Sequence, residues 1–103
     1  MKIFRKLIRD RIPEIIEQDG KKPVTRVLDD AEFLIALENK LLEEVQEMRQ
    51  GKNKKMEIAD IYEVLDALIQ AYGFSKEEIS AIQKKKREER GGFDKRLFLE
   101  KTE

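Results

Sequence analysis

The sequence predicts an all-α fold, an antiparallel helical bundle built from a single domain that spans residues 1–103. Apolar residues recur at helical spacing in two long segments, about 30–50 and 54–72, and a short turn at Gly51 separates them. Two helices joined by so few residues must run antiparallel. Capping signals that mark where helices begin are the third observation behind this prediction.

A short first helix is expected at about 10–19, with Asp10 as its cap and a proline in its first turn. The next segment, KKPVTRVLDD, is extended in character because its proline fixes the backbone and its valines and threonine are β-branched. Asp29 and Glu32 form a D-x-x-E capping signal at its end. We therefore expect the second helix to begin near residue 30.

The second and third helices each carry an apolar stripe, and we expect the two stripes to form the seam of a helical hairpin. The stripe of the second helix is Leu34, Leu37, Leu41, Val45 and Met48. The stripe of the third helix is Ile58, Ile61, Leu65, Leu68, Ile69 and Tyr72. Val64, Ala67 and Ala71 lie outside this stripe and indicate a second packing partner. In a chain this short, that partner is expected to be another subunit of a homo-oligomer, a dimer or a tetramer.

A fourth helix is predicted to open at Ser75, which forms an S-x-x-E capping box with Glu78. It runs into the charged sequence KKKREER and is broken by two consecutive glycines. The tail alternates enough at 96–99 to predict a strand, which we expect to pair with residues 24–28 in a minor two-stranded ribbon.

Composition removes several classes of function. The chain has 22 basic and 22 acidic residues, so its net charge of zero argues against nucleic acid or an anionic membrane as a partner. It has no cysteine and no histidine, which excludes thiol chemistry and leaves carboxylates as the main metal ligands and proton acceptors. The first segment, MKIFRKLIRDRIPEII, has neither a signal-peptide core nor a spanning segment, so a cytoplasmic location is expected.

Four carboxylates stand around the turn of the predicted hairpin. Glu44 and Glu47 form an E-x-x-E pair on one helix, and Glu57 and Asp60 form an E-x-x-D pair on the other. Residues that are equally far from the turn lie at the same height, so the four side chains occupy two levels one helical turn apart. Helical geometry places them at the edge of the apolar seam.

Such crowded carboxylates would repel one another unless a cation gathers them. A divalent ion such as Mg²⁺, which accepts carboxylates and bridges phosphates, would satisfy them. Acidic residues at this spacing also recur by chance in so charged a chain. The residues alone therefore leave open a solvated helix flank that carries salt bridges.

KLLEEVQE followed by EIADIYEVLDAL resembles the acidic core of the all-α nucleoside triphosphate pyrophosphohydrolases, the MazG superfamily. The segments KLIRDRIPEII and KREERGGFDKRLFLE look like its small, single-domain branch that is related to phosphoribosyl-ATP pyrophosphohydrolase. The resemblance spans nearly the whole chain. One departure is the spacer of nine residues between Glu47 and Glu57, which is commonly longer in the superfamily.

This resemblance implies hydrolysis of a nucleoside triphosphate between the α- and β-phosphates, which yields a monophosphate and pyrophosphate. It implies that Glu44, Glu47, Glu57 and Asp60 bind Mg²⁺, with Mn²⁺ as an alternative. Glu44 or Glu47 is expected to act as the general base or to position the attacking water.

Basic residues at both ends of the chain are candidates for binding the substrate's phosphates. They are Lys6 and Arg9 near the N-terminus and Arg90 and Arg96 near the C-terminus. In the sequence RGGF, glycines allow backbone N–H groups to approach phosphate, and Phe93 can stack on a base or pack in the core. Taken one at a time, most of these basic residues are also consistent with solvated side chains and salt bridges at helix ends.

Two alternative functions remain open from the sequence, and a third has weaker support. Phosphoribosyl-ATP is an alternative substrate within the same reaction class. A non-catalytic helical module that dimerises through its apolar seams is the alternative from another class. A nucleic-acid-binding module is supported only by KKKREER, where interleaved acids reduce the local charge.

Overall fold

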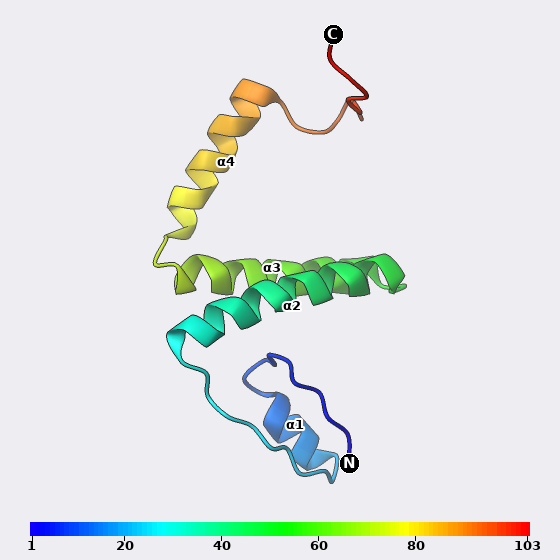
Figure 1. Cartoon of the computed structure of the whole chain (residues 1–103), viewed down its shortest axis with the longest axis vertical. Helices are drawn as coiled ribbons and strands as arrows, with labels where there is room; N and C mark the ends of the chain where they lie inside the picture. The colour runs from blue at the N-terminus through cyan, green and yellow to red at the C-terminus, as the bar shows by residue number, and fades with distance from the viewer.

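The computed structural model describes all 103 residues and contains four α-helices and no β-strand. The helices are α1 (Ile12–Gln18), α2 (Asp30–Gln50), α3 (Lys54–Ala71) and α4 (Lys76–Arg90) (Figure 1). The all-α prediction is therefore confirmed. None of the helices combines the length and the apolar character that crossing a membrane requires.

α2 and α3 lie side by side as an antiparallel hairpin (Figure 1). α2 begins with the predicted capping box, in which Asp29 Oδ1 accepts a hydrogen bond of 2.8 Å from the backbone N–H of Glu32. The hairpin turn needs glycine at residue 51, because a β-carbon on Gly51 would lie 2.8 Å from the backbone oxygen of Glu47 and 2.7 Å from Glu57 Oε1. The turn therefore brings the two acidic pairs close together.

The seam between α2 and α3 is narrow. Leu37 of α2 and Val64 of α3 are 2% and 7% exposed, and Glu44 is the third and last buried residue of the chain. The half-buried side chains of Ala67 and Ala71 flank the same face of α3. α3 thus approaches α2 with a face that combines these small residues with Ile61 and Leu68, which are half-buried three residues before and four after Val64.

The apolar stripe predicted for α3 lies in the seam only in part, because Ile61 and Leu68 are half-buried on the face of Val64 while other members of the stripe face outward. Ile58, Leu65 and Tyr72 are 44%, 39% and 48% exposed. Val64 and its alanine neighbours, which were expected to face another subunit, pack inside the chain instead. Because α3 is apolar around much of its circumference, periodicity alone does not select the inward face.

The N-terminal region lies on one side of the hairpin, and α4 extends from the other side (Figure 1). α1 is shorter than predicted and has Arg11, not Asp10, at its N-cap position, with no side-chain cap bond. Its proline lies in the first turn as predicted. α4 begins with the predicted capping box, in which Ser75 Oγ accepts a hydrogen bond of 3.1 Å from the N–H of Glu78.

The predicted ribbon between residues 24–28 and 96–99 is wrong. The two segments lie at opposite ends of the molecule (Figure 1). α4 is 15 residues long and carries the tail about 22 Å away from the hairpin. Arg96 also has a φ of 57°, a left-handed conformation that does not belong to a strand.

The four helices do not form a closed bundle within one chain. The molecule measures 59 × 33 × 25 Å, and its radius of gyration is 17.9 Å. A compact domain of this length has a radius of gyration of about 13 Å. The antiparallel packing that was predicted is therefore present only in the α2–α3 hairpin.

Candidate metal centre

Three carboxylates from the two helices of the hairpin meet at one point. Oxygen atoms of Glu44, Glu57 and Asp60 all lie within 4.8 Å of one another. Glu44 belongs to α2, while Glu57 and Asp60 lie three residues apart on α3 and so project from the same side of that helix. These are three of the four carboxylates that the sequence analysis assigned to metal binding.

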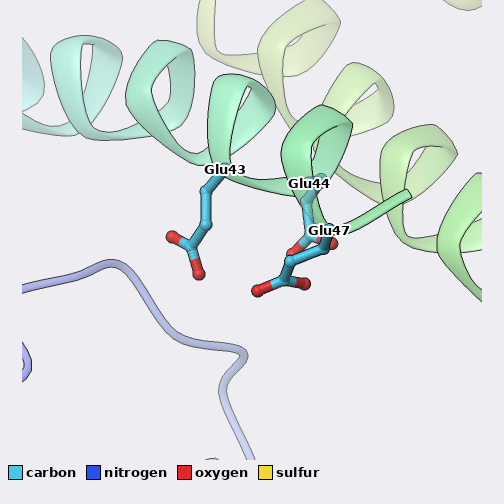
Figure 2. A group of neighbouring side chains, drawn as sticks. All are labelled: Glu43, Glu44 and Glu47. Atoms are coloured by element: carbon cyan, nitrogen blue, oxygen red, sulfur yellow. The ribbon is translucent and has the colours of Figure 1, made fainter. Parts of the chain in front are cut away.

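The fourth predicted carboxylate, Glu47, belongs to an adjoining group. Oxygen atoms of Glu43, Glu44 and Glu47 likewise lie within 4.8 Å of one another. Figure 2 shows these three side chains leaving α2 towards the N-terminal segment. Glu43 was missed by the sequence analysis, although its position four residues before Glu47 places both on one helical face. Glu44 is shared by the two groups and forms the centre of the cluster.

Glu44 is unusual among the acidic residues because it is buried. Its side chain is 8% exposed, and Lys40 Nζ lies 3.4 Å from Glu44 Oε1. Glu44 Oε2 is buried and accepts no hydrogen bond. Burial raises the pKa of Glu44, and the neighbouring charges of Glu47 and Asp60 raise it further, while Lys40 opposes the shift. A buried carboxylate oxygen without a partner is costly, and a cation at this point would satisfy it.

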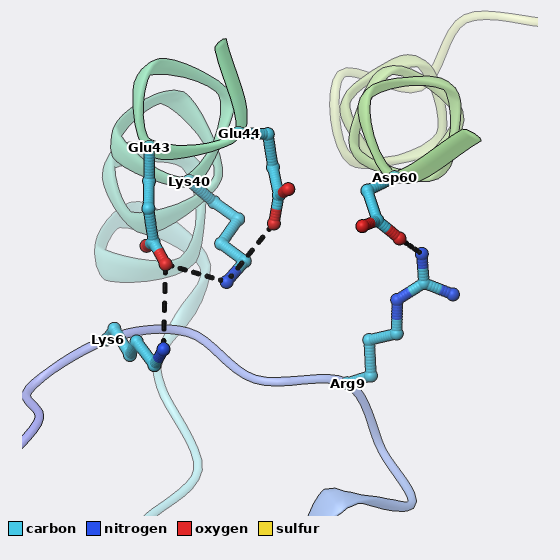
Figure 3. Close-up of polar contacts among 6 residues, drawn as sticks. All are labelled: Lys6, Arg9, Lys40, Glu43, Glu44 and Asp60. Atoms are coloured by element: carbon cyan, nitrogen blue, oxygen red, sulfur yellow. Dashed lines mark hydrogen bonds and ion pairs between the residues drawn. The ribbon is translucent and has the colours of Figure 1, made fainter. Parts of the chain in front are cut away.

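Three basic side chains surround the cluster (Figure 3). Lys40 Nζ lies 3.2 Å from Glu43 Oε1, within α2. The N-terminal segment supplies the other two, because Lys6 Nζ lies 3.6 Å from Glu43 Oε1 and Arg9 Nη2 donates a hydrogen bond of 2.7 Å to Asp60 Oδ1. This segment therefore crosses the acidic side of the hairpin and reaches both helices.

Lys6 and Arg9 were both predicted to bind substrate phosphate, and the fold places them beside the carboxylates. Lys40 was missed, although its spacing of three and four residues from Glu43 and Glu44 is that of helical ion pairs. Arg9 and Lys6 are 55% and 41% exposed, so both remain accessible to a ligand from solvent.

The other three predicted substrate contacts do not join the cluster. Arg90 ends α4, and Phe93 and Arg96 follow it in the tail, at the far end of the molecule (Figure 1). Phe93 is 97% exposed, so it is not a core residue of this chain. Near the two glycines the guanidinium of Arg87 approaches Asp94, with 3.6 Å between Nη2 and Oδ2.

The cluster has the donor chemistry of a hard divalent cation. Its ligand atoms are all carboxylate oxygens, and the chain has no histidine or cysteine that would favour a softer metal. The donors project from helices, which leaves positions for water or phosphate oxygens, as Mg²⁺ requires. The residues therefore fit Mg²⁺ or Mn²⁺.

Comparisons with known proteins give one partial relative. A protein of Mycolicibacterium smegmatis (strain ATCC 700084 / mc(2)155), described as uncharacterized, is 56% identical to this chain over 43 residues. The match covers 42% of this chain and 44% of the relative, so the chain spans less than half of that protein. The chain matches no protein-family model. It matches no solved structure either.

Proposed function

We propose that this protein is a Mg²⁺-dependent nucleotide pyrophosphohydrolase, which hydrolyses a nucleoside triphosphate to a monophosphate and pyrophosphate. The observation that carries the proposal is the buried, unpartnered Oε2 of Glu44 within a carboxylate group drawn from both helices. A solvated helix flank would leave no such atom out of contact with water. The resemblance to the MazG superfamily supplies the reaction.

Glu44, Glu57 and Asp60 would hold the ion, and Glu47 stands beside them. When bound, Mg²⁺ neutralises phosphate charge and lowers the pKa of water. Glu47 is the better placed of the two predicted general bases, because it is exposed whereas Glu44 is buried. Glu47 would accept the proton of the attacking water, and pyrophosphate would leave from the α-phosphorus.

Lys6 and Arg9 would bind the substrate's phosphates. Both stand on the acidic side of the hairpin, and Arg9 can offer a planar fork of donors to a phosphate group. Their present carboxylate partners are also candidate neighbours of the ion, so a bound ion would free both cations for phosphate. Arg90, Phe93 and Arg96 stay predictions, since the end of α4 and the tail that carry them lie far from this cluster (Figure 1).

We further propose that the enzyme works as a cytoplasmic homo-oligomer. Outward-facing apolar residues on α2 and α3 support the assembly, since Leu42 and Tyr62 are 66% and 65% exposed. The same observation favours the second candidate function, a helical dimerisation module without catalytic activity. A dimerisation module would not explain why Glu44 is buried in the acidic cluster with an unpartnered carboxylate oxygen.

The test is pyrophosphate release from a panel of standard and modified nucleoside triphosphates and phosphoribosyl-ATP, with and without Mg²⁺. Glu44→Gln and Asp60→Asn should each lower activity by about 100-fold or more, because loss of a group one shell further out already costs 10–100-fold. Glu89→Gln on exposed α4 is the matched control and should retain full activity.

The panel and a calorimetric titration separate the alternatives. Mg²⁺-dependent activity that both cluster variants lose and the control keeps would support the proposal. Turnover of phosphoribosyl-ATP far above every triphosphate would identify it as the substrate. No activity, together with no heat of Mg²⁺ binding, would overturn the enzyme and leave the dimerisation module.

A further inference from the structure

The single chain exposes far more surface than a compact protein of its size. Its accessible surface is 10143 Å², whereas a compact monomer of 12.2 kDa exposes about 6,000 Å². The excess is about 4,000 Å², and large obligate interfaces bury about 2,000–5,000 Å² summed over both partners. One chain therefore has ample surface to form an extensive interface with a second.

One part of this surface is the apolar flank of the hairpin, formed by Ile35, Leu42, Ile58, Tyr62 and Leu65, which are between 39% and 66% exposed. On α3, Ile58 and Tyr62 each lie two residues from Asp60, a rotation of about 200° around the helix axis. Leu42 stands in the same relation to Glu44 on α2. The apolar flank is therefore turned away from the acidic cluster and from the N-terminal segment.

The second part is the C-terminal arm, residues 74–103. α4 contributes no buried residue, and the arm meets the rest of its own chain only at the corner where α3 passes into α4 (Figure 1). The tail contains three consecutive large apolar residues, Leu97, Phe98 and Leu99, which are 86%, 88% and 78% exposed. Three such side chains in a row are not expected to remain in water.

We propose that the C-terminal arm of one chain docks on the hairpin of a second copy, with Leu97, Phe98 and Leu99 covering the apolar flank. The exchange is reciprocal, so two copies close into a two-fold dimer and no arm is left over. A second copy is favoured over the arm's own hairpin because α4, capped at its start by Ser75, directs the tail away from it. This inference does not depend on the proposed enzymatic function.

The absence of cysteine from the chain makes a cross-linking test clean. A chain with Phe98→Cys and a differently tagged chain with Leu42→Cys are mixed and oxidised. We expect a disulfide species that contains both tags. Glu63→Cys replaces Leu42→Cys in the matched control, because Glu63 is exposed and lies two residues, about 200°, from Leu65 of the apolar flank. The control should give several-fold less of the mixed species.

Light scattering and a second variant complete the test. The wild-type chain should have twice its chain mass of 12.2 kDa, and Leu97→Ser/Phe98→Ser should shift it to a monomer with unchanged helical circular dichroism, since both residues lie outside the helices. A wild-type monomer, a dimer that persists in the double-serine variant, or equal cross-linking of the control would overturn the proposal. So would a disulfide formed within one chain that carries both Phe98→Cys and Leu42→Cys, because the arm would then cover its own hairpin.

Discussion

The hairpin and the C-terminal arm are built from equally regular helices but differ in what their side chains contact. In the hairpin, Leu37 and Val64 are buried between α2 and α3, and Glu44 is enclosed with them. In the arm, α4 has a complete capping box yet buries nothing. Local sequence signals thus suffice to form a helix, whereas its place in the molecule depends on an apolar partner surface.

The largest expected difference between the two regions lies in core stability. Leu37→Ala removes the most buried side chain and should lower the free energy of unfolding by about 2–4 kcal/mol. Ile82→Ala in α4, where the side chain is 54% exposed, should cost less than about 1 kcal/mol. Urea titrations followed by circular dichroism measure both. Equal losses would mean that the arm belongs to the same cooperative core as the hairpin.

A smaller contrast is expected at the two capping boxes. Asp29→Ala at the start of α2 and Ser75→Ala at the start of α4 each remove a side-chain cap worth about 1 kcal/mol. The loss at α2 should appear in global unfolding because α2 is half of the hairpin seam. The loss at α4 should appear mainly as faster local hydrogen exchange in residues 76–79. If Ser75→Ala lowers the free energy of global unfolding as much as Asp29→Ala does, α4 unfolds together with the hairpin and the two regions do not differ.

The sequence predicted the helices themselves better than it predicted which surfaces they pack against. Caps, glycines and apolar periodicity predicted the bounds of α2, α3 and α4 because these signals act within a few residues of each other. The inward face of α3 was predicted only in part. Ile61 and Leu68 are half-buried beside Val64, whereas Ile58 is exposed, and only the close approach of α2 distinguishes these apolar residues. The ribbon failed for a related reason: residues 24–28 and 96–99 have strand-like patterns but no neighbouring strand.

The acidic cluster was easier to anticipate than its cationic surroundings. Turn symmetry placed Glu44 opposite Asp60, because an antiparallel pair with a short turn has little freedom. That Lys6 and Arg9 reach these carboxylates could not be read from the sequence, since the contact between Arg9 and Asp60 spans 51 residues. Burial of Glu44 could not be read either, because it depends on how closely α3 approaches.

The pH dependence of stability should identify Glu44 as the carboxylate whose ionisation destabilises the hairpin. Its pKa is raised by burial and by Glu47, so the folded chain holds this proton more tightly than the unfolded chain. The resulting stabilisation is complete below the unfolded pKa of about 4.3 and is lost as pH rises through the raised folded value. In metal-free buffer, wild type should lose stability relative to Glu44→Gln across this window, as thermal melts at several pH values would measure. Parallel pH profiles would contradict the assignment.

The smallest expected change in stability concerns the link between the N-terminal segment and the hairpin. The Arg9–Asp60 pair is 55% and 39% exposed, so Arg9→Gln should change the free energy of unfolding by no more than about 0.5 kcal/mol.

The effect of Arg9→Gln on ligand binding should be larger than its effect on stability, and it should strengthen the binding of Mg²⁺ but weaken that of the triphosphate. Mg²⁺ should bind a few-fold more tightly because Asp60 Oδ1 loses its competing guanidinium, while the KM of the triphosphate should rise several-fold because a phosphate contact is lost. Calorimetry measures the first and initial rates the second. Arg11→Gln, an exposed neighbour for which the structure shows no ion pair, is the control and should alter neither. If Arg9→Gln leaves both quantities unchanged, Arg9 forms only a surface ion pair and has no part in the site.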